Sequence, residues 1–171
     1  RCVIGKGLYG MRFGGMIFKK WNTPEEWAQA ALEAGYSAVY FPVDYTADSY
    51  LRLIEAIDRK GFAAHLDPVN VICSPQLYYR NGEAIREWFD KLGTQIRSCH
   101  AKDIILGGKL TVHLDECRPG LGALDYETYL KCMSKLDDRT CMMLEHMTEE
   151  IDYIEATKYI KGLAKKLNIA L

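Results

Sequence analysis

The sequence has neither a marked excess of one charge nor a long apolar run. Its 22 basic and 23 acidic residues give a formal net charge of -1, which leaves no basic surface for nucleic acid to be expected. No stretch reaches the roughly 18 consecutive apolar residues of a membrane span. The glycine-rich start, Arg1 to Gly15, carries no apolar signal core. We therefore expect a cytoplasmic protein without a nucleic-acid or membrane partner.

The six cysteines form no CxxC pair. Cys99 and Cys141 stand in apolar runs, where cysteine behaves as a small hydrophobic residue. The pattern predicts reduced thiols rather than a disulfide framework.

The chain is long enough to bury a core, with 171 residues of which 49% are hydrophobic. No low-complexity linker and no block of like charges divides it. The sequence therefore predicts one domain over residues 1–171.

Apolar strands and amphipathic helices alternate five times along the chain. Strands are expected over residues 11–18, 38–43, 62–67, 96–100 and 141–145. Helices are expected from Thr23 to Ala34, over 47–60 and 82–92, from Asp125 to Leu136, and from Thr148 to Leu167. A long loop is expected over 109–124. The alternation predicts parallel strands joined by right-handed crossovers.

Three of the expected strands each end at a residue able to bind a divalent metal, namely Asp67, His100 and Glu145. In parallel sheets and barrels, the loops that follow the strands build the ligand site, so polar residues at that end favour chemistry. Two carboxylates with one imidazole suit Mn, Mg or Co and also admit Zn. The sequence therefore predicts a site for one divalent cation.

Each of these residues also has a purely structural interpretation. Asp67 precedes Pro68 and can serve a turn, and His100 can be a hydrogen-bonded core histidine. Glu145 can be an ion-pair partner of Lys102 or Arg118. Their joint placement at three consecutive strand ends favours a metal site, either functional or a remnant of an ancestral one.

Three further residues are candidate substrate contacts. Lys102 and Asp103 follow His100 and either orient a substrate or pair with each other. Arg118 lies in the long loop, where its guanidinium either holds substrate hydroxyls or a phosphate, or is simply solvated. The sequence leaves these alternatives open.

Four motifs resemble those of the xylose isomerase-like sugar isomerases and epimerases, and they occur in that family's order. They are His-Leu-Asp-Pro-Val-Asn at 65–70, His-Ala-Lys-Asp at 100–103, Arg-Pro-Gly-Leu-Gly-Ala-Leu-Asp-Tyr at 118–126 and Met-Leu-Glu-His at 143–146. The resemblance covers about residues 48–171 well, and residues 11–45 are similar to the family's first two units.

The resemblance implies a TIM barrel with one divalent cation, acting on a small sugar or sugar phosphate by proton transfer at the carbon beside a carbonyl. It also implies that Asp67, His100 and Glu145 are the metal ligands and that Glu145 is an acid/base carboxylate. Arg118 would contact the substrate.

The chain departs from the family in length, because such barrels have about 250 residues. It passes from a strand ending near Asp44 directly to the helix that precedes the family's sixth strand. The predicted fold is thus α/β, a truncated TIM-like parallel barrel of about five βα units. The missing stretch would hold the fifth-strand glutamate, a metal ligand and the opposing acid/base carboxylate. Asp44 is a candidate replacement by position alone.

Two functions stay open. The first is a divalent-metal-dependent sugar isomerase or epimerase whose activity is weak or lost, because losing one positioned acid/base group costs roughly 10²-fold or more. The second is a non-catalytic, self-associating shortened barrel with a remnant metal site. An internal deletion or a fragment would carry the same motifs. Because five parallel strands leave sheet edges uncovered, we also predict a symmetric homodimer.

Overall fold

A computed structural model describes residues 2–3, 13–36, 38–39, 46–59 and 61–171. The chain divides into two compact units, Arg1–His65 and Leu66–Leu171, and each is described by itself. The single domain predicted from the sequence stays a prediction. Asp44 lies outside the described residues.

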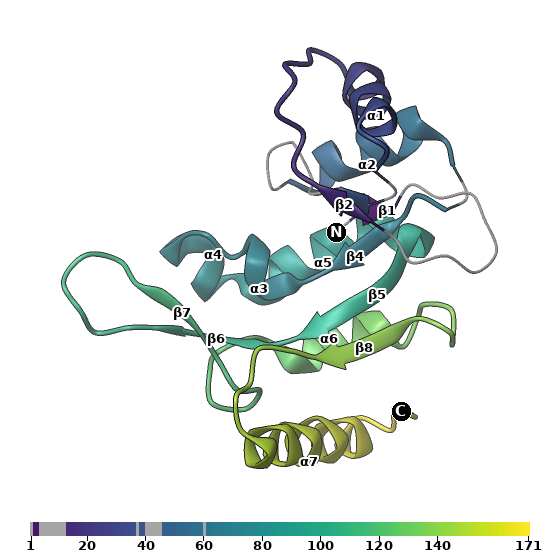
Figure 1. The fold of residues 1–171 in the computed structure, drawn as a ribbon. Coiled ribbons are helices and arrows are strands. Elements are labelled where there is room, and N and C mark those ends of the chain that lie inside the picture. Colours follow the sequence, from purple (N-terminus) through teal and green to yellow (C-terminus); the bar gives the residue numbers. More distant parts are fainter. Residues whose placement is uncertain (1, 4–12, 37, 40–45, 60) are drawn as a thin grey trace. The chain divides into compact units, whose positions relative to one another are not determined.

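The first unit combines three short strands with two helices (Figure 1). Its elements are β1 (Cys2–Val3), β2 (Gly14–Gly15), α1 (Pro24–Glu33), β3 (Ala38–Val39) and α2 (Ala47–Ile57). Strand β3 lies in the middle of the sheet, antiparallel to β1 and parallel to β2. The predicted strands over 11–18 and 38–43 therefore appear in part, and residues 11–12 and 40–43 lie outside the described ranges.

The helix ends of the first unit follow local side-chain chemistry. The Thr23 hydroxyl accepts a hydrogen bond from the backbone N–H of Glu26, which confirms the predicted cap. Helix α2 ends at Ile57, three residues before the predicted end, because Asp58 takes a left-handed conformation with φ 41°. Trp27 and Phe62 are buried edge to face in this unit's core.

The second unit contains most of the regular structure. Its elements are β4 (Ala64–Leu66), α3 (Pro68–Val71), α4 (Pro75–Tyr79), α5 (Asn81–Leu92), a 3₁₀ turn (Gly93–Gln95), β5 (Ile96–Ala101), β6 (Asp103–Leu106), β7 (Leu114–Cys117), α6 (Tyr126–Met133), β8 (Cys141–Leu144) and α7 (Glu150–Lys166). The division between the units falls within β4, after His65. The short helices α3 and α4 were not predicted.

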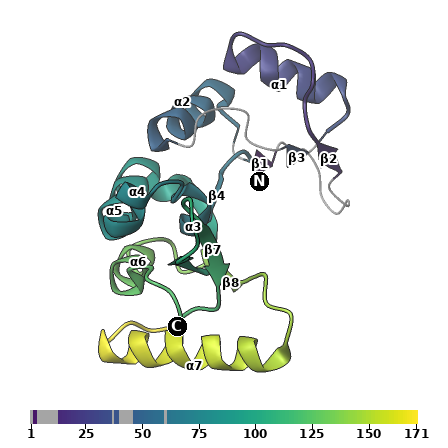
Figure 2. The same ribbon diagram turned by 90° about the vertical axis from the view of Figure 1, so that its left-hand side faces the viewer.

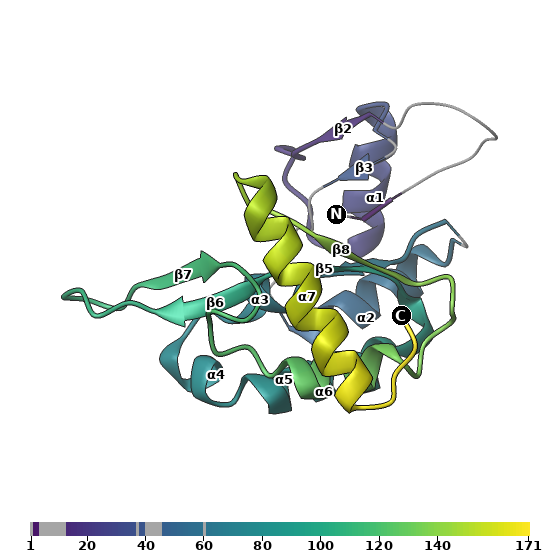
Figure 3. The same cartoon turned by 90° about the horizontal axis from the view of Figure 1, so that it is seen from below.

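The central sheet of this unit has the order β4-β5-β8, and β5 pairs with β8 in parallel. Helices α5, α6 and α7 lie on one face of the sheet (Figure 2), and α7 runs across β5 and β8 (Figure 3). Burial alternates along β5 as expected for a strand with one covered face: Cys99 and Ala101 are fully buried, whereas Ser98 and His100 are partly exposed. The partly exposed face carries the predicted ligands.

Strands β6 and β7 form an antiparallel hairpin that the sequence analysis missed. The prediction of a long loop over 109–124 is wrong for Leu114–Cys117, which pairs with Asp103–Leu106. The reason is that Leu-Asp-Glu-Cys has two acidic residues in four and no β-branched residue, so its composition gives no strand signal. The hairpin projects beside the sheet (Figure 1) and brings new side chains to the site.

Of the two caps predicted for helices α6 and α7, the first is confirmed and the second is wrong. The carboxylate of Asp125 accepts hydrogen bonds from the backbone N–H and the hydroxyl of Thr128, as a capping residue should. The prediction of Thr148 as the cap of α7 is wrong by one residue, since α7 begins at Glu150 and Glu149 takes the cap position without a side-chain bond.

The alternation of strands and helices and the parallel pairing of β5 with β8 confirm an α/β fold with a parallel sheet. In the described ranges, the strands form two three-stranded sheets and one hairpin, and no closed barrel is seen. The closed, five-unit barrel therefore stays a prediction.

No helix in the described part of the chain is both long enough and apolar enough to cross a bilayer. The five cysteines described there are free thiols. Cys99 is buried, and burial raises its pKa to about 12, as expected of a thiol that serves as a small core residue. Cys141 is exposed, unlike its expected core position.

Candidate metal centre

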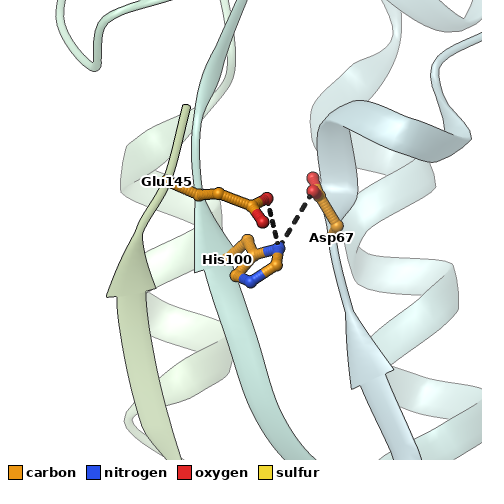
Figure 4. A group of neighbouring side chains, drawn as sticks. All are labelled: Asp67, His100 and Glu145. Atoms are coloured by element: carbon orange, nitrogen blue, oxygen red, sulfur yellow. Dashed lines mark hydrogen bonds and ion pairs between the residues drawn. The ribbon is translucent and has the colours of Figure 1, made fainter. Parts of the chain in front are cut away.

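The structure brings the three predicted ligands together in the second unit. Asp67 directly follows β4, His100 lies near the end of β5, and Glu145 directly follows β8, so the side chains point toward one another (Figure 4). His100 Nδ1 lies 2.7 Å from Glu145 Oε2 and 3.4 Å from Asp67 Oδ2. One ligand atom from each residue falls within 4.8 Å of the other two.

The two carboxylate oxygens of Asp67 have different partners, one in the backbone of α3 and the other in the candidate metal centre. Its Oδ1 accepts hydrogen bonds from the backbone N–H groups of Val69 and Asn70 and so caps α3. Its Oδ2 faces His100 and Lys102. The turn and the ligand interpretations of this residue are therefore compatible, because each uses a different oxygen.

Helix α6 fixes the strand that carries His100. The Tyr129 hydroxyl donates a hydrogen bond to the backbone carbonyl of His100, and the Tyr126 hydroxyl donates one to the backbone carbonyl of Lys102. Each O–O distance is 2.7 Å. Both tyrosine side chains are buried, so these bonds are shielded from water. They hold the backbone on both sides of Ala101 in one position.

Lys102 places an ammonium group among the carboxylates. Its Nζ lies 2.9 Å from Asp67 Oδ2, 2.6 Å from Glu116 Oε1 and 3.6 Å from Glu145 Oε2, and it donates to Asn70 Oδ1 over 3.1 Å. The residue is only 2% exposed. Burial by itself lowers the pKa of Lys102, but hydrogen bonds with Glu116 and Asp67 outweigh it and raise the pKa. Asp67, Glu116 and Asn70 are close enough to accept from the three N–H groups of the ammonium. The geometry therefore favours a positioning role over a substrate contact.

Glu116 is a site residue that the sequence analysis missed. It lies on β7 of the hairpin and contacts Lys102 through Oε1 and His146 Nδ1 through Oε2, the latter over 2.7 Å. Burial raises the pKa of Glu116, but hydrogen bonds from Lys102 and His146 outweigh this and lower it overall. His146 has a positive φ of 61°, which is uncommon for a residue other than glycine. Without the hairpin, no sequence signal could have placed Glu116 here.

Asp103 holds a loop together. Its two carboxylate oxygens accept four backbone hydrogen bonds, of 2.8 to 3.1 Å, from the N–H groups of Ile104, Gly120, Gly122 and Leu124. The residue is 1% exposed. This arrangement favours a structural role over the predicted substrate contact.

The same loop explains the Gly-Leu-Gly part of the third motif. A Cβ on Gly122 would lie 2.3 Å from Asp103 Oδ1 and 2.4 Å from the carbonyl oxygen of Ile104, so a side chain cannot fit. Gly120 has φ 92°, a conformation that favours glycine. The motif is therefore explained by close packing around Asp103.

Arg118 precedes this loop and faces the first turn of α7. Its Nε lies 3.2 Å from Asp152 Oδ1, and its Nη1 donates to the carbonyl of Pro119 over 3.5 Å. A pocket of about 130 Å³ lies between this arginine, Lys102, Glu116 and Glu145. The predicted substrate contact of Arg118 stays a prediction, with the guanidinium now placed at a pocket.

The donor set suits a divalent cation. Two carboxylate oxygens and one imidazole nitrogen are ligands that Mn, Co and Zn accept, and Mg accepts the oxygens. All three side chains are at most partly exposed, and the carbonyl of His100 is fixed by Tyr129. The fold and these residues thus define an α/β protein with a candidate metal centre at the ends of neighbouring strands.

Comparison with known proteins finds similarity among solved structures. No protein-family model matches the chain, and no curated protein matches it either. Among solved structures, the chain is similar to the xylose isomerase domain protein from Planctomyces limnophilus, with 26% sequence identity and a TM-score of 0.58. The match covers 82% of this chain and 49% of that one, so the chain spans about half the length of its structural relative.

This similarity confirms the resemblance that the four motifs indicate. The chain has a xylose isomerase-like fold, of the kind that sugar isomerases and epimerases use. The partial coverage of the relative agrees with the predicted shortening.

Proposed function

We propose that Asp67, His100 and Glu145 bind one divalent cation and that the protein acts, weakly, as a sugar isomerase or epimerase. The observation that supports this proposal is the convergence of the three ligand atoms within 4.8 Å at neighbouring strand ends. The xylose isomerase-like fold adds the substrate class, a small polyhydroxy carbonyl compound.

The chemistry of such a site follows from its residues. A divalent cation bound there would polarise a substrate carbonyl and its neighbouring hydroxyl. The Glu145 carboxylate would accept the proton from the carbon beside the carbonyl through Oε1, because Oε2 is the oxygen that lies 2.7 Å from His100 Nδ1, whereas Oε1 lies 3.5 Å from His146 Nε2. Lys102 would keep Asp67 and Glu145 in place through its ion pairs.

The proposed activity is weak because the second acid/base carboxylate of the family is missing. Proton transfer by one positioned group alone loses roughly 10²-fold or more. The non-catalytic alternative has one observation in its favour, because the Lys102 ammonium lies 2.9 Å from Asp67 Oδ2 and 3.6 Å from Glu145 Oε2 and so balances part of their negative charge.

Titration of the metal-free protein with Mn²⁺ and Co²⁺ by calorimetry tests the proposal. We expect one binding site per chain with a dissociation constant in the micromolar range, and a metal-dependent rise in melting temperature because only the folded state presents the site. Absence of binding at millimolar metal would reject the metal centre and leave the remnant interpretation.

We also propose that the protein self-associates as a homodimer. Three apolar side chains beside the edge of the sheet are well exposed, Met143 on β8 at 54% and Ile151 and Ile154 on α7 at 57% and 42%. A groove of about 790 Å³ between β8, α6 and α7 adds apolar lining from Met142 and Leu144. Burial of exposed apolar side chains such as these, and cover for the edge strand β8, would favour a dimer.

Light scattering coupled to size-exclusion chromatography should therefore give a mass near 39 kDa, twice the 19.5 kDa of one chain. Ile151→Glu is expected to shift the protein toward the monomer, because it places a charge in the interface. A wild-type protein that remains monomeric at micromolar concentration would contradict the dimer.

A further inference from the structure

The pocket beside the metal centre is lined by charged side chains of both signs. Lys102 and Glu145 border it from the sheet, Glu116 and Arg118 from β7 and the loop after it, and Asp152 from the first turn of α7. Its volume of about 130 Å³ is enough for a few heavy atoms of a ligand that extends from the metal centre. The charges on its walls therefore decide what kind of ligand end it accepts.

Both cations of the pocket already have carboxylate partners. Lys102 lies between Asp67 and Glu116, with N–O distances of 2.9 and 2.6 Å. Arg118 pairs with Asp152 over 3.2 Å. Each cation therefore has a carboxylate beside it that offsets its charge, although the buried Nε of Arg118 makes no hydrogen bond within the described part of the chain.

The charges also balance when the proposed metal is counted. One divalent cation, Lys102 and Arg118 together carry four positive formal charges. The four carboxylates of the site and pocket match them, namely Asp67, Glu116, Glu145 and Asp152. A phosphate dianion would bring two negative charges into a region that has no positive excess, whereas hydroxyl groups can be bound by the same donors and acceptors.

We propose that Glu116 and Asp152 set the specificity of this pocket, so that it accepts uncharged polyhydroxy compounds and rejects their phosphate esters. The inference rests on the proposed function, since the metal centre supplies part of the charge. It narrows the substrate class from sugar or sugar phosphate to the unphosphorylated sugar.

The hairpin gives this proposal a matched control. Asp115 and Glu116 are consecutive on β7, so their side chains leave opposite faces of the strand. Asp115 is exposed and lies beside Gly107, opposite Ile105 in the register. Asp115→Asn removes the same charge as Glu116→Gln from the same strand, but on the face turned away from Lys102.

The test compares inorganic phosphate, D-fructose and D-fructose 6-phosphate as probes in calorimetric titrations of the Mg²⁺-loaded protein. The wild type should bind the sugar and bind its phosphate ester at least about tenfold more weakly. Glu116→Gln and Asp152→Asn should each shift this ratio toward the ester by about tenfold, because each removes one negative charge from beside a cation of the pocket. The double variant should bind inorganic phosphate, and Asp115→Asn should behave as the wild type.

A wild type that binds the ester as tightly as the sugar, or that binds neither, would overturn the proposal. The proposal would also be overturned if the Glu116→Gln and Asp152→Asn variants are folded by circular dichroism but show no gain in affinity for the phosphate ester or for inorganic phosphate. The Mg²⁺ titration tests the metal centre independently of the pocket's selectivity. If the protein binds no Mg²⁺ but the variants gain phosphate affinity as described, the pocket's selectivity stands and the proposed metal role alone is lost.

Discussion

Replacing Glu145 with glutamine is expected to weaken Mn²⁺ binding by about a hundredfold or more, because one of three protein ligands loses its charge. Changes of residues that merely support metal ligands already cost about 10- to 100-fold in affinity. The amide keeps the shape of the side chain, so the backbone around β8 should stay in place. The measurement is a calorimetric titration of the variant beside the wild type.

Glu149→Gln is a suitable control for this variant. Glu149 is exposed, lies four residues further along the chain, and loses the same charge without contact to the triad in the described structure. Equal Mn²⁺ affinity of wild type and Glu145→Gln would contradict the three-ligand centre. Equal loss in both variants would indicate a general effect of charge instead of a lost ligand.

The same pair of variants separates the two functional interpretations. In a remnant site, Lys102 is the resident cation, and its ion pairs with Asp67 and Glu116 need no metal. Glu145→Gln would then leave metal binding unchanged. Any change in melting temperature from its contacts with His100, at 2.7 Å, and Lys102, at 3.6 Å, would be the same with and without Mn²⁺. In a functional centre, the variant loses the metal-dependent stabilisation.

The grouping of Asp67, His100 and Glu145 could be predicted from the sequence because the signal is local. Apolar strands that end in Asp67, His100 and Glu145 place their ends at one edge of a parallel sheet, whatever the rest of the chain does. The alternation of side chains along β5 was equally predictable, since a strand with one covered face has a period of two. These predictions needed only the element order.

The position of Glu116 and the structural role of Asp103 could not be predicted, because both depend on contacts between residues far apart in the sequence. Glu116 joins the site because β7 pairs with β6, with Ile104 opposite Glu116, and no composition signal marks this hairpin. The role of Asp103 depends on backbone N–H groups that lie up to 21 residues further along the chain. The sequence analysis therefore predicted Asp103 only as a candidate substrate contact and did not predict Glu116.

Asp103→Ala is expected to destabilise the protein by about 4 kcal/mol, because it leaves four backbone N–H groups without their acceptor, two of them on the buried residues Ile104 and Leu124. Asp103→Asn should cost less, about 2 kcal/mol, since its amide oxygen still accepts from one pair of donors. Urea unfolding followed by circular dichroism gives the free energies. Asp115→Ala, an exposed position on the same hairpin, should change stability by less than about 0.5 kcal/mol.

This prediction also distinguishes the two roles of Asp103. If the carboxylate only holds the loop, the folded fraction of Asp103→Asn at low temperature should bind Mn²⁺ and sugar as the wild type does, because the triad and the pocket walls do not include Asp103. A variant with wild-type stability and lost sugar binding would instead restore the substrate contact predicted from the sequence. The four hydrogen bonds and the 1% exposure of Asp103 favour the first result, since a carboxylate shared among four backbone donors has little capacity left for a ligand.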